Sequence, residues 1–195
     1  MKRRTSVALL VIWMAISVMA DGPAKHPVYT ILPDQSSVKF YVKASIDLRG
    51  IFDKWGTNLT CASTEPASCV LDLKVQAGSV NTGSGMKDGK LKSKDFFNVI
   101  VDPLITFKST KIEQSGAHTF TAVGVFTIRG VSKTETLTLT GTPEADGAEI
   151  KGQMAFDRQD YGMTHGIPFI KIADRVEVNV GLKAKRSGPP LDLKQ

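Results

Sequence analysis

An arginine in the last third of the chain continues a strand face that is otherwise uncharged. Alternate positions before it hold isoleucine, glycine, methionine and phenylalanine, and Arg158 follows in the same phase. A buried guanidinium needs a charge partner, so we expect Asp157, Asp160 or a bound anion to neutralise it. Arg158, Arg129 and Lys133 all lie beside apolar strand faces. We expect one of these three cations to meet the phosphate, quinone or carboxylate head of a ligand.

Reactive side chains do not occur in a spacing typical of catalysis or metal binding. The sequence has no serine in a strand-to-helix elbow and no cysteine partnered by a histidine. Three carboxylates are not paired as glycoside hydrolysis requires: Asp157, Asp160 and Glu177. The histidines lack the spacing of metal ligands: His26, His118 and His165. We therefore predict a protein that is not an enzyme and that holds no metal or other cofactor.

Two cysteines flank a short loop. Cys61 and Cys69 are separated by small polar residues around Pro66, which is typical of a turn. In an exported chain both would lie in an oxidising compartment, where a disulfide is favoured over free thiols. We predict a disulfide that closes a hairpin and stabilises the fold by about 2–3 kcal/mol.

The elements that must position these residues are strands, because apolar residues recur at every second position along most of the chain. Such segments begin near residues 38, 56, 71, 105, 120, 137, 150 and 176, and turn sequences separate most of them. Eight strands with hairpin-like connections predict an all-β fold, an antiparallel β-barrel, since closure leaves no exposed edge. A two-sheet sandwich has the same alternation and is the alternative.

The expected inward face mixes aromatic and small residues. A packed core explains this mixture, because large and small side chains interdigitate. A ligand-lined tunnel explains it equally, because inward glycines leave space. The sequence leaves both interpretations open for the same set of residues: Phe40, Ala44, Phe107, Ala122, Gly124, Phe126, Gly152 and Phe156.

Residues 81–103 interrupt the alternation. They are polar, glycine-rich and basic, and then become apolar at Phe96 and Phe97. Segments of this length in compact domains are usually functional or disordered, and adjacent aromatic residues favour order. We predict one or two short helical turns that form a lid or rim over the barrel mouth. Residues 187–195 contain two prolines and are predicted to be a flexible tail.

The N-terminus has the pattern of a secretory signal peptide. Basic residues at positions 2–4 precede an apolar run at 7–19, and Ala20 closes it. We predict cleavage after Ala20 and a periplasmic location. An uncleaved anchor is the alternative, although the run is shorter than the roughly 20 residues of a membrane span. Removing three basic and no acidic residues lowers the net charge from +6 to +3. That charge is too small and too dispersed for nucleic-acid binding, and no later stretch predicts stable membrane insertion.

An ordered set of motifs resembles the YceI-like family of periplasmic polyisoprenoid-binding proteins: YTILPDQSSVKFYV, SVNTGSGMKDGKLKSKDFF, PLITFKST, FTIRGVSKTETLTL, FDRQDYGM and IADRVEVNV. The resemblance extends from about Tyr29 to Lys185. It implies an eight-stranded, lipocalin-like barrel whose apolar tunnel holds a prenyl or fatty chain, frequent homodimers and no established catalysis. Gln35 stands where the family typically has histidine, and the cysteine pair is not a family hallmark.

These observations predict a signal peptide at residues 1–20, a single YceI-like β-barrel domain at 21–186 and the tail at 187–195. We expect the protein to bind or sequester one long apolar ligand: a polyisoprenoid, an isoprenoid quinone or a fatty-acyl chain. The alternatives are a stress-related interaction protein with a filled barrel that acts through its surface, and a hydrolase or isomerase acting on a lipid. The expected ligand-binding residues are Phe40, Val42, Phe97, Phe107, Phe126, Ile128, Phe156, Arg158 and Tyr161.

Overall fold

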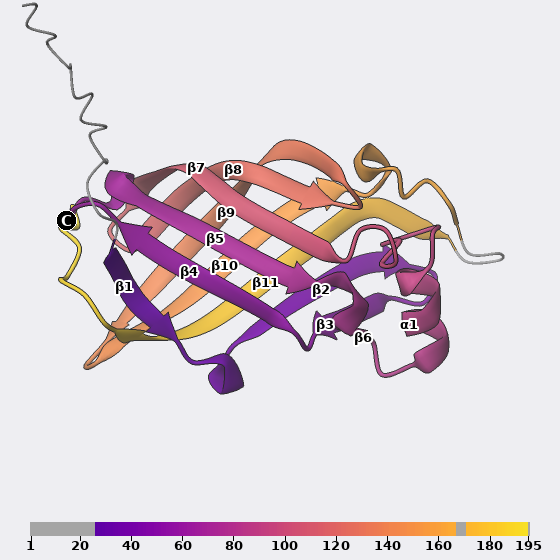
Figure 1. Ribbon diagram of the computed structural model, residues 1–195, viewed down its shortest axis with the longest axis horizontal. Helices are drawn as coiled ribbons and strands as arrows, with labels where there is room; N and C mark the ends of the chain where they lie inside the picture. Colours follow the sequence, from indigo (N-terminus) through magenta and orange to yellow (C-terminus); the bar gives the residue numbers. More distant parts are fainter. Residues whose placement is uncertain (1–25, 167–170, 195) are drawn as a thin grey trace, which may run out of the picture.

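The chain forms a twisted antiparallel sheet that curves round on itself (Figure 1). The computed structural model describes residues 26–166 and 171–194. The predicted signal peptide and its cleavage after Ala20 lie outside these residues. The described strands are β1 (His26–Ile31), β2 (Ser37–Ala44), β3 (Leu48–Phe52), β4 (Trp55–Cys61), β5 (Cys69–Gln76), β6 (Val80–Asn81), β7 (Leu104–Gly116), β8 (Thr119–Ile128), β9 (Val131–Glu144), β10 (Gly147–Asp157) and β11 (Ile172–Arg186).

Eight of the strands described close into a barrel in the order β1-β4-β5-β7-β8-β9-β10-β11. The ring closes where β11 pairs with β1, with Tyr29 opposite Arg186 and Ile31 opposite Ala184. Every neighbouring pair in the ring is antiparallel. The predicted eight-stranded antiparallel barrel is therefore confirmed, and the sandwich alternative is wrong because the sheet closes on itself.

Three short strands, β1, β3 and β6, lie outside the eight segments expected from the sequence. A 3-10 turn at Pro33–Gln35 separates β1 from β2, so that β1 closes the ring while β2 pairs with the other half of β11. β3 and β6 extend the sheet beyond β2. The alternation is weak in β3 because only Phe52 of its five residues is buried.

The barrel has two dissimilar ends (Figure 1). The mouth end carries α1 (Gly85–Lys92), the β8–β9 turn and the 3-10 turn at Gln159–Tyr161 that follows β10. The predicted helical turn within residues 81–103 is confirmed by α1. The disulfide end carries the β4–β5 hairpin, and residues 187–194 run beside it. Among the residues described, no helix has the length and apolar character needed to cross a membrane.

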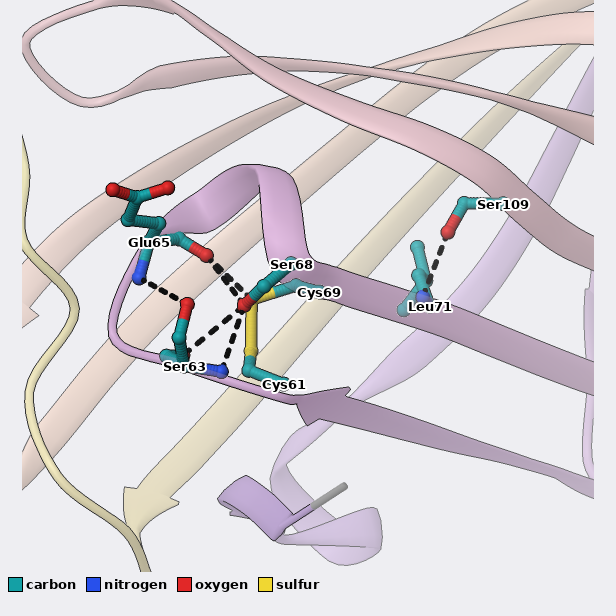
Figure 2. The surroundings of a disulfide bond; sticks show 7 residues. All are labelled: Cys61, Ser63, Glu65, Ser68, Cys69, Leu71 and Ser109. Carbon is teal, nitrogen blue, oxygen red and sulfur yellow. Dashed lines mark hydrogen bonds between the residues drawn. A yellow bond between two sulfur atoms is a disulfide. The ribbon is translucent and has the colours of Figure 1, made fainter. Parts of the chain in front are cut away.

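The β4–β5 hairpin is joined by the predicted disulfide. Cys61 and Cys69 face each other in the strand register and are bonded through their sulfur atoms. Within the loop, Ser68 Oγ donates to the carbonyl of Glu65 (2.8 Å) and accepts from the amide of Ser63 (3.0 Å), as Figure 2 shows. These bonds satisfy polar groups of a loop that has no strand partner.

A buried serine side chain of β7 accepts a hydrogen bond from a backbone amide of β5. The register of β7 shifts between Ser109 and Lys111, where it pairs with β8. The amide of Leu71 donates to Ser109 Oγ at 2.8 Å (Figure 2). Because an unpaired buried amide is costly, this bond explains a polar side chain that is only 3% exposed.

Candidate functional site

An apolar cavity occupies the mouth half of the barrel. Its volume is about 80 Å³, several times the roughly 10–15 Å³ that one water molecule needs. Inward residues of the strands form its walls, and Leu91, Phe96 and Phe97 of the 81–103 segment contribute to its lining. Thr106 and Arg158 are the polar or charged residues among those that line it.

The described interior holds more than one cavity. A second cavity lies toward the disulfide end and shares no lining residue with the first. Leu71, Ala122 and Leu182 are buried and line neither cavity. Each of the three lies between a residue of the same strand that borders the second cavity and another that borders the first. We call these three residues the waist.

Most of the predicted binding residues meet at the first cavity. Tyr161 does not line it and lies behind its wall, with its ring edge-on to Phe126 and Phe156 at centroid distances of 5.4 and 5.2 Å. Its hydroxyl donates to Glu135 Oε1 at 2.8 Å. Burial, together with this bond to Glu135, raises the pKa of Tyr161. The predicted residues that do line the cavity are Phe40, Val42, Phe97, Phe107, Phe126, Ile128, Phe156 and Arg158.

Arg158 is buried, as the alternation predicted, but its charge partner is neither Asp157 nor Asp160. Nη2 lies 2.9 Å from Asp174 Oδ1 of β11. Nε donates to the carbonyl of Ala173 (3.3 Å), and Nη1 donates to the carbonyls of Met163 and His165. The guanidinium thus anchors the segment after β10 to β11, because four of its contacts are made within the protein.

The other two candidate cations do not border the cavity. Arg129 donates to the carbonyls of Lys94 (2.7 Å) and Gly162, and so ties the β8–β9 turn to two neighbouring segments. Lys133 pairs with Asp160 at 2.6 Å and lies 5.8 Å from the ring centroid of Tyr161. Of the three cations proposed for a head group, Arg158 alone is among the lining residues.

The 81–103 segment forms part of the cavity wall rather than a detached flap. The amide of Phe97 donates to the carbonyl of Leu91 at 2.9 Å, which folds the aromatic pair under α1. Asp88 of α1 accepts from the hydroxyl and amide of Thr82, at 2.7 and 2.8 Å, and these bonds lower the pKa of Asp88. Lys90 pairs with Asp95 at 2.6 Å and lowers the pKa of Asp95.

Phe52 is a lining residue that the sequence analysis missed. Its ring lies 5.6 Å from that of Phe40 and 5.9 Å from that of Phe97, so it connects the strand wall to the 81–103 segment. Phe40 in turn leans over Gly50, where a Cβ atom would lie 2.5 Å from the ring. The two-residue spacing of Gly50 and Phe52 was the available signal, but it was too short to indicate a strand.

The described residues contain no group of three or more histidine, cysteine or acidic side chains that could hold a metal ion. The three carboxylates considered for acid-base chemistry make local contacts. Asp160 pairs with Lys133, and Glu177 lies 3.4 Å from Arg175. Asp157 accepts from the amide of Gln159 at 2.8 Å. These contacts do not bring the three groups together at the cavity.

Fold and cavity define the class: a closed antiparallel barrel with an apolar interior. The YceI-like domain model matches residues 29–184, and the chain belongs to that family. Among curated relatives, a UPF0312 protein of Yersinia enterocolitica is 35% identical over 90 residues, and one of Yersinia pestis is 32% identical over 90 residues. Each match covers 46% of this chain and 46% of the relative, so the chain matches about half the length of these proteins.

Solved structures share the fold. Burkholderia cenocepacia BcnA superposes with a TM-score of 0.72 at 21% identity, over 78% of this chain and 98% of that chain. The Campylobacter jejuni YCEI protein has a TM-score of 0.60 at 24% identity, over 74% of this chain and 87% of that chain. A polyisoprenoid binding domain from Saccharophagus degradans has a TM-score of 0.59 at 15% identity, over 83% of this chain and 100% of that chain. At these identities the likeness establishes the barrel architecture.

Proposed function

We propose that this protein is a periplasmic binding or sequestering protein that holds one long apolar ligand in its first cavity. The observation that carries the proposal is the chemistry of that cavity, whose lining is apolar apart from Thr106 and Arg158. The polyisoprenoid-binding domain with the same architecture supports a polyisoprenoid, an isoprenoid quinone or a fatty-acyl chain as the ligand.

Burial of a hydrocarbon chain supplies the affinity in this proposal. Each buried methylene contributes about 0.8 kcal/mol, so about ten carbons contribute roughly 8 kcal/mol before ordering costs. A cavity of about 80 Å³ is too small for such a chain without rearrangement. Phe40, Phe52 and Phe97 form a connected group of rings at this wall, and we infer that they rotate to admit the ligand.

The polar end of the ligand lies at the mouth in this proposal. Arg158 borders the cavity, and three of its hydrogen bonds go to neutral carbonyl groups. An anionic head could replace one of these carbonyl partners, because a full negative charge attracts the guanidinium more strongly than a carbonyl dipole does. Replacing Arg158 with Ala should then weaken ligand binding, and unchanged affinity would remove Arg158 from the site.

The mechanism is binding without turnover. This interpretation is supported by the lining of the first cavity, in which Thr106 and Arg158 are the residues with polar or charged side chains. Activity toward a lipid ester or isoprenoid that disappears on replacing Thr106 with Val would instead favour the enzymatic alternative.

Native mass spectrometry of protein purified from its own periplasm, followed by solvent extraction, tests the proposal. We expect a discrete added mass in the lipid range. In the variant Val42→Phe a smaller fraction of the protein should carry the added mass, because Val42 is buried and lines the cavity. Val125→Phe makes the same change at a position that is 39% exposed, and this variant should carry the added mass to the same extent as the wild type. An unliganded mass after gentle handling would contradict the proposal.

A second candidate function, action through the surface, is favoured by an exposed apolar pair near the mouth. Ile100 is 95% exposed and Val101 is 70% exposed, and exposed apolar groups of this kind mark contact surfaces when they form a patch. The family resemblance implies homodimers, so a second copy of this chain is the partner that we infer for this surface. Sedimentation that changes from dimer to monomer on replacing both residues with Ser, in a protein that carries no lipid, would select this candidate.

A further inference from the structure

The second cavity lies at the disulfide end of the barrel, opposite the mouth. Its volume is about 160 Å³, twice that of the first cavity. Leu139, Ala148 and Ile150 supply part of its wall from β9 and β10, and Ile112 contributes from β7. Its lining is predominantly apolar, with His118 and Arg186 among the few polar residues. Native interiors contain few voids larger than a water molecule, so a space of this size calls for an explanation.

The waist separates this cavity from the first. Along β8, Phe120 borders the second cavity, Ala122 borders neither and is fully buried, and Phe126 borders the first. Leu182 occupies the corresponding place on β11. A chain held in the first cavity therefore meets packed side chains before it reaches the second, and the two spaces can fill independently.

The end of the chain forms the roof of the second cavity. Residues 187–194 have no helix or strand, yet Pro190, Leu191 and Leu193 line the space. Leu191 also packs against the buried core. This segment therefore supplies apolar surface to the cavity even though it lacks a backbone ladder.

Backbone and side-chain hydrogen bonds hold that roof in place. The amide of Asp192 donates to the carbonyl of Thr64 (2.8 Å), and the hydroxyl of Thr64 donates to the carboxylate of Asp192 (2.5 Å). Gln114 of β7 accepts from the amide of Lys194 (2.8 Å) and donates to its carbonyl (2.7 Å). Thr64 belongs to the loop closed by the disulfide, so the disulfide-bonded hairpin provides one of the attachment points of the roof.

We propose that this space is a second ligand site, which takes a compact apolar molecule about the size of a benzene ring. An engineered protein cavity of about 150 Å³ with aliphatic and aromatic walls stays dry and binds benzene or xenon. The present cavity has a similar volume, and aliphatic and aromatic side chains such as Ile112, Phe120 and Leu139 form much of its lining. The inference goes beyond the proposed function, because it concerns the opposite end of the barrel and does not require a long-chain ligand in the first cavity.

Methyl NMR of the purified protein titrated with benzene tests the site. We expect saturable shifts for the methyl groups of Leu139, Ile150 and Leu191, and the same shifts in Val42→Phe, which narrows the first cavity. Ala148→Leu fills the second cavity and should weaken these shifts at least tenfold. Ala155→Leu makes the same change on β10 at a position that does not line it and should leave them intact.

Two outcomes would overturn the proposal: no saturable shift at these methyl groups, or an equal shift in Ala148→Leu. If Ala148→Leu does not fold, a chain that ends at Gly188 decides the question, since it lacks the roof residues. Loss of the benzene shifts at Leu139 and Ile150 in that chain supports the site, and their retention contradicts it. Failure of benzene binding here leaves the mass measurement for the first cavity unaffected, so the two proposals fail separately.

Discussion

Arg158 and Asp174 form an ion pair whose two partners differ sharply in exposure. Nη2 and Oδ1 are 2.9 Å apart, and the arginine side chain is 8% exposed whereas the aspartate side chain is 42% exposed. The pair therefore joins the interior of the barrel to its surface. It also joins the segment after β10 to β11, because Arg158 follows the last residue of β10.

Asp174→Ala should lower the free energy of unfolding by about 1–3 kcal/mol. Breaking a fully buried pair costs about 3–5 kcal/mol, and the exposed side of Asp174 reduces that figure through solvent screening. Urea unfolding gives the measurement. Asp160→Ala removes the partner of Lys133, an exposed pair, and should cost less than about 1 kcal/mol. Equal losses in the two variants would show that the burial of Arg158 has no energetic consequence.

Gly50→Ala should weaken ligand binding in the first cavity. The added Cβ would lie 2.5 Å from the Phe40 ring, so the ring must move, and overpacking of this kind costs about 1–3 kcal/mol. Phe40 lines the cavity, and its displacement narrows the space for a ligand. Gly56→Ala is the control, since no atom lies within 4 Å of its Cβ position. The amount of lipid extracted per protein should fall in the first variant only.

Replacing both Cys61 and Cys69 with Ser should lower the free energy of unfolding by about 2–3 kcal/mol, because the unfolded chain regains the conformational entropy that the closed short loop removes. Thermal or urea unfolding measures the loss. Hydrogen exchange should also accelerate at the amides of Asp192 and Lys194, because Thr64 in the disulfide loop bonds Asp192. Unchanged exchange at these amides would mean that the disulfide does not help to hold the roof.

Thr82→Val should raise the pKa of Asp88 toward its ordinary value, because the side-chain bond from Thr82 is the main cause of the depression. A carboxyl whose pKa is lower in the folded state contributes stability above its unfolded pKa. That contribution is lost as the pH falls through the lowered folded pKa. The wild-type protein should therefore lose part of its stability below about pH 4, and Thr82→Val should lose less over the same range.

NMR titration of the Asp88 side chain measures both effects. Asp102, a carboxyl that has no bond to Thr82, serves as an internal reference in the same spectra. Overlapping titration curves for Asp88 in the wild type and in Thr82→Val would contradict the assigned cause.

The barrel itself could be predicted because alternation is a local property. Leu71 and Leu73 are buried and Lys74 is exposed, as their two-residue period requires. The inward position of Arg158 followed from the same period. The disulfide could be predicted from the spacing of Cys61 and Cys69 and from the oxidising compartment expected for an exported chain. Strands β1 and β3 escaped prediction because they are short, and in β3 only Phe52 is buried.

The sequence by itself determined which side chains face inward, since the period of a strand is set by the backbone. Only the tertiary structure decided which of those side chains fill the interior and which leave space. Leu137 and Leu139 share one inward face, yet Leu137 borders the first cavity and Leu139 the second. Likewise, Asp174 neutralises Arg158 because β10 and β11 pair. Cavity volume and charge pairing depend on distances between strands, which the order of residues within any one strand does not contain.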